Sequence, residues 1–84
     1  MPYIEKSQRR KYNILLDHIY EIETKGDLEY CIFKLQKIYM KTRKFKYSNL
    51  HDTVYAAQHC SDEFRRRYLD KRENEARKNN GDVE

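Results

Sequence analysis

The sequence predicts an all-α protein, a small three-helix protomer with two shorter helices and one long C-terminal helix. Proline occurs once and glycine twice in 84 residues, so the chain lacks the residues that punctuate a strand-and-turn protein. Apolar residues recur every three or four positions along most of the chain, which is the spacing of one helix face. We expect a single domain over residues 1–84, with helices at about 5–23, 28–42 and 49–78 and a tail at 79–84.

The first two helices are predicted to meet in the stretch TKGDLEY. Gly26 can adopt the left-handed conformation that ends a helix, and Asp27 can cap the next helix by accepting hydrogen bonds from its free amides. The apolar stripe of the first helix is Tyr12, Leu15, Leu16, Ile19 and Ile22. The apolar face of the second is Leu28, Cys31, Ile32, Leu35, Ile38 and Tyr39.

The third helix is predicted to begin near Leu50, with Ser48 or Asn49 as its cap. Its apolar side consists of Leu50, Thr53, Ala57, Cys60, Phe64 and Tyr68. Beyond Tyr68 the same side becomes charged. The helix is therefore expected to continue past the core of its own protomer.

A partner subunit is expected from chain length and from the second helix. A domain this small buries only about 60% of the surface that its unfolded chain exposes. Phe33 and Met40 point away from the main apolar face of the second helix, and a second apolar face is most simply explained by contact with another subunit. The alternative is that both are isolated surface residues. We expect a homo-oligomer with Phe33 and Met40 at its interface.

Positive charge is concentrated in the middle of the chain, although the formal net charge is only +4. Between Glu29 and Asp52 there is no acidic residue, and the basic residues there are Lys34, Lys37, Lys41, Arg43, Lys44 and Lys46. Such a block attracts partners that carry phosphate, and a basic surface without a specific ligand is the alternative.

Three consecutive arginines, Arg65, Arg66 and Arg67, cannot share one face of an α-helix at about 100° per residue. Asp62 and Glu63 precede Arg66 and Arg67 by four residues, the favourable order for ion pairs. Arg65 has no acid four residues away on either side. Arg66 is expected on the surface, whereas Arg67 can either pair with Glu63 or line a crevice and grip a phosphate.

No motif predicts catalysis, a cofactor or a metal. His18, His51 and His59 lack metal-ligand spacing, and adjacent His59 and Cys60 project about 100° apart on a helix. No apolar run approaches the roughly 18 residues that span a membrane. Without a secretory signal, the two cysteines, Cys31 and Cys60, are expected to be reduced and packed in a cytoplasmic protein.

Four blocks carry a family resemblance: the opening MPYI, the GDLEY restart, the EFRRR segment and the closing NNGDVE. Together they resemble a family of small proteins encoded by tailed bacteriophages and generally described as having no known function. Matching positions are Pro2, Tyr3, Ile4, Gly26, Asp27, Leu28, Tyr30, Glu63, Phe64, Arg66, Arg67, Glu73, Asn80, Gly81, Asp82 and Val83. The chain departs from the family pattern at Glu29, Arg65, Lys71 and Glu84, where the family tends to have asparagine, tyrosine, proline and tyrosine.

The resemblance implies a phage origin, a location in the infected bacterial cell and no established activity. The proline missing at Lys71 leaves open whether the third helix runs straight. The resemblance also draws attention to the tail, where Gly81 and Asp82 can form a turn that folds the chain end onto a neighbour. Asn80, Gly81, Asp82 and Val83 are therefore further candidates for an oligomer interface, with a frayed terminus as the alternative.

Binding is the predicted function. By analogy with short phage proteins that resist host immunity, we expect an anti-defence sponge that holds an anionic nucleotide signal in basic, aromatic pockets between subunits. The candidate ligand-binding residues are Tyr3, Tyr30, Lys34, Lys37, Arg65 and Arg67, with Tyr3 stacking on a base and the cations contacting phosphate. The alternatives are non-specific nucleic-acid binding through the Lys34–Lys46 block, with Phe45 and Tyr47 interleaved, or inhibition of a host enzyme through Phe33 and Met40.

Overall fold

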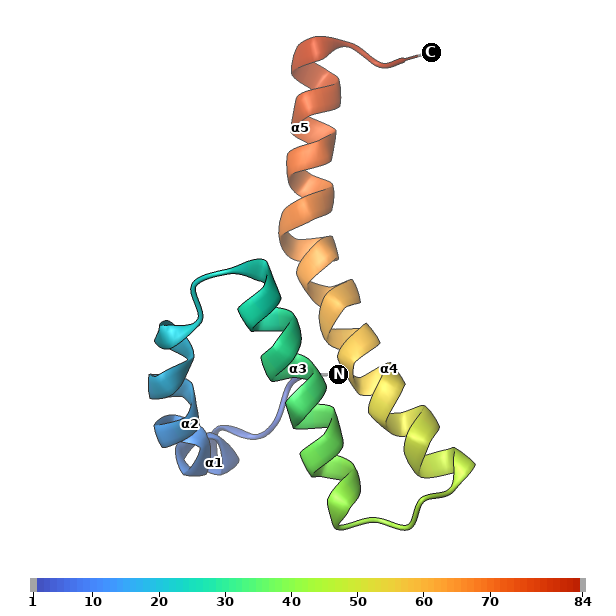
Figure 1. Cartoon of the computed structure of the whole chain (residues 1–84). Helices are drawn as coiled ribbons and strands as arrows, with labels where there is room; N and C mark the ends of the chain where they lie inside the picture. Colours follow the sequence, from blue (N-terminus) through green and yellow to red (C-terminus); the bar gives the residue numbers. More distant parts are fainter. Residues whose placement is uncertain (1, 84) are drawn as a thin grey trace.

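The structure is a computed structural model that describes residues 2–83, and helices joined by short connections make up this part of the chain (Figure 1). The first helical segment consists of α1 (Lys6–Arg9), η1 (Arg10–Tyr12), α2 (Asn13–His18) and η2 (Ile19–Glu21). The second is α3 (Lys25–Lys41), and the third consists of α4 (Tyr47–Phe64), η3 (Arg65–Leu69) and α5 (Asp70–Asn80). The predicted all-α fold with three helices, the last of them the longest, is confirmed.

The first helical segment is less regular than the single helix predicted over 5–23. The 3₁₀ turn η1 interrupts it and the 3₁₀ turn η2 ends it, and neither has a side-chain cap. No acidic residue lies in the first turn of α1. The bases at the start of this helical segment, across α1 and η1, are Lys6, Arg9, Arg10 and Lys11. Positive charge at a helix N-terminus opposes the helix dipole, which disfavours a regular α-helix at this end.

Helix α3 begins earlier than expected because a capping box forms at Thr24. The Asp27 amide donates to Thr24 Oγ1 at 3.0 Å, and the Thr24 amide donates to Asp27 Oδ2 at 3.1 Å. The prediction that Gly26 ends one helix and Asp27 caps the next was wrong: Gly26 lies in the first turn of α3. Reciprocal bonds from Thr24 and Asp27 satisfy amides that a cap at Asp27 alone would leave free.

Helix α4 also begins earlier than predicted, at Tyr47, with Lys46 at the N-cap position and no side-chain cap. The predicted caps Ser48 and Asn49 lie inside the helix. Asn49 instead donates from Nδ2 to the Lys44 carbonyl at 2.9 Å, which ties the connection between α3 and α4 to the helix start.

The long helix changes direction at η3, where α5 leaves the rest of the chain (Figure 1). Residues Arg65–Leu69 form a π-helix, and the Asp70 amide donates to the Arg65 carbonyl five residues earlier. The α-helical geometry predicted for the three arginines was therefore wrong at this segment. The bend lies just before Lys71 and needs no proline.

Gly81 ends the long helix in the left-handed region, with φ of 85°. Helix α5 runs to Asn80, two residues beyond the predicted end at 78. Arg77 Nε lies 3.8 Å from Asp82 Oδ2, so the tail turns toward its own helix. Met1 and Glu84 lie outside the described residues. Contact between the tail and a neighbour stays a prediction.

The described residues form no buried apolar core. Thr53 on α4 is buried at 8% exposure, and Leu50 and Ala57 beside it are half-buried. Further along the same side Phe64 is 64% exposed and Tyr68 is 55% exposed. The predicted burial of Phe64 and Tyr68 was wrong: the long helix is uncovered already at Phe64, before the predicted change at Tyr68.

Helix α3 packs beside α4, and its apolar residues are only partly covered. Met40, predicted to point away from the chain's own packing, is half-buried within the chain. Phe33 is 59% exposed. The predicted apolar face is exposed except for half-buried Cys31, and the second cysteine, Cys60, is exposed rather than packed.

The chain as a whole is extended. Its accessible surface is 8325 Å², whereas a compact monomer of 10.4 kDa would expose about 5,400 Å². Its radius of gyration is 16.8 Å, compared with about 12 Å for a compact domain of this length. An isolated chain of this shape leaves most of its apolar side chains in water.

Candidate functional site

The N-terminal segment meets the long helix in a hydrogen-bonded group of four side chains, Tyr3, Glu63, Arg66 and Arg67, which we name the Glu63 cluster. The Tyr3 hydroxyl donates to Glu63 Oε1 at 2.5 Å and accepts from Arg67 Nη2. Arg66 Nη2 and Arg67 Nε each donate to the same Glu63 oxygen at 2.6 Å. One carboxylate oxygen therefore receives three donors from two distant parts of the chain.

Local structure explains how these side chains meet. Glu63 lies in the last turn of α4, three and four residues before Arg66 and Arg67, and side chains at these spacings are neighbours on a helix surface. The N-terminal segment is held in turn by Arg9, whose Nε donates to the Ile4 carbonyl at 3.1 Å. Tyr3 thus reaches the long helix from a segment anchored at the start of the first helix.

The Glu63 cluster is strongly ionised. The hydrogen bond from Tyr3, and then those from Arg66 and Arg67, lower the pKa of Glu63 from its ordinary 4.5 to about 2. The hydrogen bond to Glu63 raises the pKa of each arginine in return. The Glu63 side chain is only 16% exposed. At neutral pH the cluster is a carboxylate held between two guanidinium groups.

An open pocket of about 240 Å³ lies beside the Glu63 cluster. Its lining residues are Pro2, Tyr3, Cys60, Glu63, Phe64, Arg67 and Tyr68. The Arg67 guanidinium carbon lies 5.2 Å from the centre of the Tyr3 ring, and the Phe64 and Tyr68 rings are 4.8 Å apart. The pocket therefore combines aromatic surface with a cation that can grip an oxyanion.

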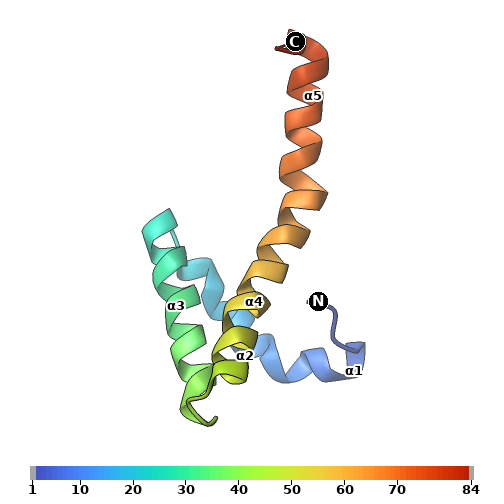
Figure 2. The ribbon, with the colours of Figure 1, turned by 90° about the vertical axis from the view of Figure 1, so that its right-hand side faces the viewer.

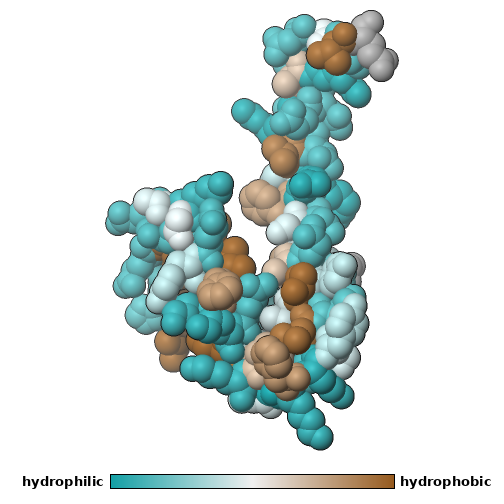
Figure 3. All heavy atoms as spheres, turned by 45° about the vertical axis from the view of Figure 1, so that its right-hand side comes forward, coloured by the Kyte–Doolittle hydropathy of each residue, from teal (hydrophilic) through white to brown (hydrophobic). Residues whose placement is uncertain are grey.

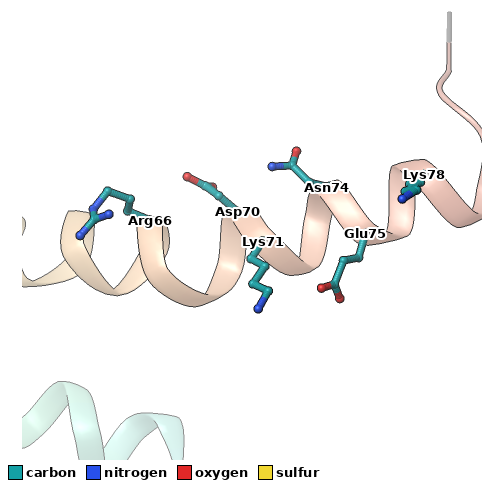
Figure 4. Close-up of a pocket in the computed structure, with 6 residues that line it drawn as sticks. All are labelled: Arg66, Asp70, Lys71, Asn74, Glu75 and Lys78. Carbon is teal, nitrogen blue, oxygen red and sulfur yellow. The ribbon is translucent and has the colours of Figure 1, made fainter.

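A second hollow, of about 360 Å³, lies along α5 (Figure 4). Its lining residues are Arg66, Asp70, Lys71, Asn74, Glu75 and Lys78. Figure 4 shows Asp70 and Asn74 pointing to one side of the helix, and Lys71 and Glu75 pointing to the other. These side chains do not converge, and their charges are mixed, so this hollow is a weaker candidate than the pocket at the Glu63 cluster.

The predicted ligand-binding residues fall into separate groups. Tyr3 and Arg67 meet at the Glu63 cluster, whereas the Arg65 side chain makes no hydrogen bond or ion pair with another described residue. Lys34 Nζ lies 5.7 Å from the Tyr30 ring centre, and Lys37 Nζ lies 5.7 Å from that of Phe33, both pairs on α3. No hydrogen bond, ion pair or ring contact among residues 2–83 joins these pairs to the cluster.

One of the two ion pairs predicted for the arginines is present in the structure. The pair of Glu63 with Arg67 is confirmed at 2.6 Å, and Arg67 both forms this pair and lines a pocket. The pair of Asp62 with Arg66 was wrong: Arg66 binds Glu63, and Asp62 accepts from Gln58 Nε2 at 3.0 Å. The contact between Tyr3 and Glu63 spans 60 positions, and no local spacing signals it.

A ladder of aromatic rings on α4 was missed from the sequence. Tyr47, His51, Tyr55 and His59 follow one another at intervals of four residues. Neighbouring ring centres are 5.7, 4.2 and 6.3 Å apart, and all four residues are exposed. The four-residue spacing of these rings was the available signal, since such residues lie on one helix side.

Two other kinds of feature are absent from the described part of the chain. No group of three or more histidine, cysteine, aspartate or glutamate residues there is arranged to hold a metal ion. No helix within residues 2–83 is long and apolar enough to cross a membrane.

Comparison with known proteins identifies the family. No curated protein and no solved structure matches this chain. A family model described as a domain of unknown function, DUF6899, matches residues 1–83. Since the match spans nearly the whole sequence, the chain belongs to the DUF6899 family.

Proposed function

We propose that this protein sequesters a small anionic nucleotide in the pocket beside the Glu63 cluster. The observation that carries the proposal is that Tyr3 and Arg67, far apart in the sequence, meet in one pocket that also contains Phe64 and Tyr68. A nucleotide presents a flat base and a charged phosphate. Aromatic rings fit the first and a guanidinium fits the second.

The arrangement of the arginines supports an oxyanion ligand. Arg66 and Arg67 already converge on one carboxylate oxygen at 2.6 Å each. A phosphate that entered the pocket would present the same kind of oxygen and would compete with Glu63 for Arg67. Arg65, whose side chain has no partner among the described residues, is available to neutralise additional phosphate charge.

The resemblance to small phage proteins supplies the biological context of the proposal. A nucleotide that signals infection inside a bacterial cell is a suitable ligand for a phage protein that binds without catalysis. Tyr30, Lys34 and Lys37 lie on α3 and do not line this pocket, so in the proposal they reach the ligand from a second subunit. The proposal therefore places a homo-oligomeric sponge in the cytoplasm of the infected cell.

Removing the Arg67 side chain is expected to weaken nucleotide capture by about tenfold to a hundredfold, the range for a hydrogen bond to a charged group. The purified protein is incubated with a panel of cyclic oligonucleotides and ADP-ribose derivatives, filtered free of unbound ligand, and heated to release what it holds. The variants are Arg67→Ala and, as a matched control on the same helix, Arg72→Ala. The control should retain wild-type capture. Recovery of no compound from the wild-type protein would show that the proposed function is wrong.

The aromatic ladder favours nucleic-acid binding as a second candidate. Phe45 and Tyr47 are exposed beside Lys44 and Lys46, and the ladder continues this surface along α4. Exposed rings with adjacent cations are typical of proteins that bind single strands without sequence preference.

For this second candidate, a single-stranded oligonucleotide is expected to shift on a native gel, and the shift should weaken steeply as salt increases. Tyr55→Ala should reduce affinity by about fivefold or more, which is the loss expected for one stacked base. Tyr20→Ala, which removes an exposed tyrosine outside the ladder, should leave the shift unchanged. Equal shifts for both variants would exclude the ladder as the binding surface.

A further inference from the structure

Three large apolar side chains lie exposed where the long helix leaves the body of the chain. Phe64, Tyr68 and Leu69, which we name the arm surface, are all exposed. Helix α5 projects away from α3 in both ribbon views (Figures 1 and 2). Figure 3 shows hydrophobic side chains along the part of the long helix that leaves the body. Large apolar groups gathered at one place on a soluble protein mark an interaction surface.

The amount of exposed surface indicates how large the missing contact is. The chain exposes 8325 Å², which exceeds the value for a compact monomer of its mass by about 2,900 Å². Interfaces of obligate oligomers remove about 1,000 to 2,500 Å² from each partner. The excess therefore corresponds to one large interface or to two smaller ones on each chain.

We propose that a second copy of this chain packs on the arm surface. A partner must be present whenever the chain folds, because no apolar side chain is buried among residues 2–83. Other copies of the same chain are always present when the chain is synthesised, so an identical copy meets this condition. The exposed residues Ala56, Cys60 and Ser61 precede the arm surface on the same helix, and such small residues leave room for the rings of an identical helix.

The charges around the arm surface favour a protein partner over a polyanion. Helix α5 carries the acids Asp70, Glu73 and Glu75 among the bases Lys71, Arg72, Arg77 and Lys78. An identical helix can form ion pairs with both signs. A nucleic acid or an anionic lipid surface would meet repulsion from the acids at the same place.

The second copy would also complete the pocket at the Glu63 cluster. Phe64 and Tyr68 belong both to the arm surface and to that open pocket, so a chain packed on the arm surface closes its apolar side. This share in the pocket rests on the proposed nucleotide function. The contact between copies does not rest on it, and a measurement of mass without nucleotide tests the contact alone.

Sedimentation velocity on the full chain should give the mass of two or more copies, each of 10.4 kDa. The double variant Phe64→Ala, Tyr68→Ala should raise the dissociation constant by at least about thirtyfold, the effect of losing an interface hot spot. A control variant with the matched changes Phe45→Ala and Tyr20→Ala removes two other exposed rings away from the arm surface and should keep the wild-type constant. A monomeric wild-type protein, or equal constants for the two double variants, would overturn the proposal.

A second measurement covers the case in which the arm variant fails to fold. Hydrogen exchange of the wild-type protein, followed by mass spectrometry, is compared between dilute and concentrated samples. Amide exchange within residues 60–69 should slow as concentration rises, because the contact protects this segment. Slowing confined to other segments would place the interface elsewhere and would also overturn the proposal.

Discussion

Dilution of the wild-type protein is expected to lower its thermal unfolding midpoint by about 4 °C for each tenfold decrease in concentration. The reason is that residues 2–83 form no buried apolar core and that the isolated chain exposes 8325 Å². Association must then supply much of the stability, and the stability of an obligate oligomer depends on protomer concentration. Circular dichroism of the helix signal over two orders of magnitude in concentration measures the effect.

A tandem fusion of two copies through a flexible linker provides the control for dilution. In the fusion the second copy stays at a fixed effective concentration, so the midpoint of a dimer should no longer depend on dilution. A midpoint that is independent of concentration in the single-copy protein would contradict the prediction. It would show that the extended chain folds without a partner.

Acidification is expected to release the N-terminal segment from the long helix. The pKa of Glu63 is lowered to about 2 from its ordinary 4.5, so the carboxylate is bound more strongly when ionised. Its contribution to stability is therefore complete above pH 4.5 and is lost as the pH falls from 4.5 through 2. Protonation of Glu63 removes the negative charge to which Tyr3, Arg66 and Arg67 donate their hydrogen bonds.

The ring resonances of Tyr3 in nuclear magnetic resonance spectra report this release, because the ring lies against Arg67 in the attached state. They should shift over the titration of Glu63. The Glu63→Gln variant lacks the titrating group, so it should show no such shift and should already have a weaker attachment at neutral pH. Identical pH profiles of Tyr3 in the two proteins would mean that another interaction holds the segment.

Parts of the Glu63 cluster could be predicted and parts could not. The pairing of Glu63 with Arg67 follows from a spacing of four residues on one helix, and the sequence predicts it as one of two roles for Arg67. Arg66 pairs with Glu63, three residues before it, and not with Asp62, four residues before it. Both spacings bring side chains together on a helix, so spacing alone does not predict which acid pairs with Arg66. Tyr3 was a candidate for stacking, but its hydroxyl bond to Glu63 depends on the path of the N-terminal segment.

Burial was the least predictable property. Met40 was assigned to a surface for another subunit and is half-buried within the chain, whereas Phe64 was placed on a buried side and is exposed. Periodicity shows which residues share a helix side. It does not show how far along that side a neighbouring helix extends, and here α5 projects beyond α3.

The sequence by itself determined the helices, because periodicity and the near absence of glycine and proline act within a few residues of each position. It also determined the charges of the Glu63 cluster. Only the tertiary structure decided that Tyr3 meets Arg67, that η3 bends the long helix, and that residues 2–83 form no buried apolar core. The first and the last of these depend on contacts between segments far apart in sequence, or on the absence of such contacts, and no local pattern encodes them.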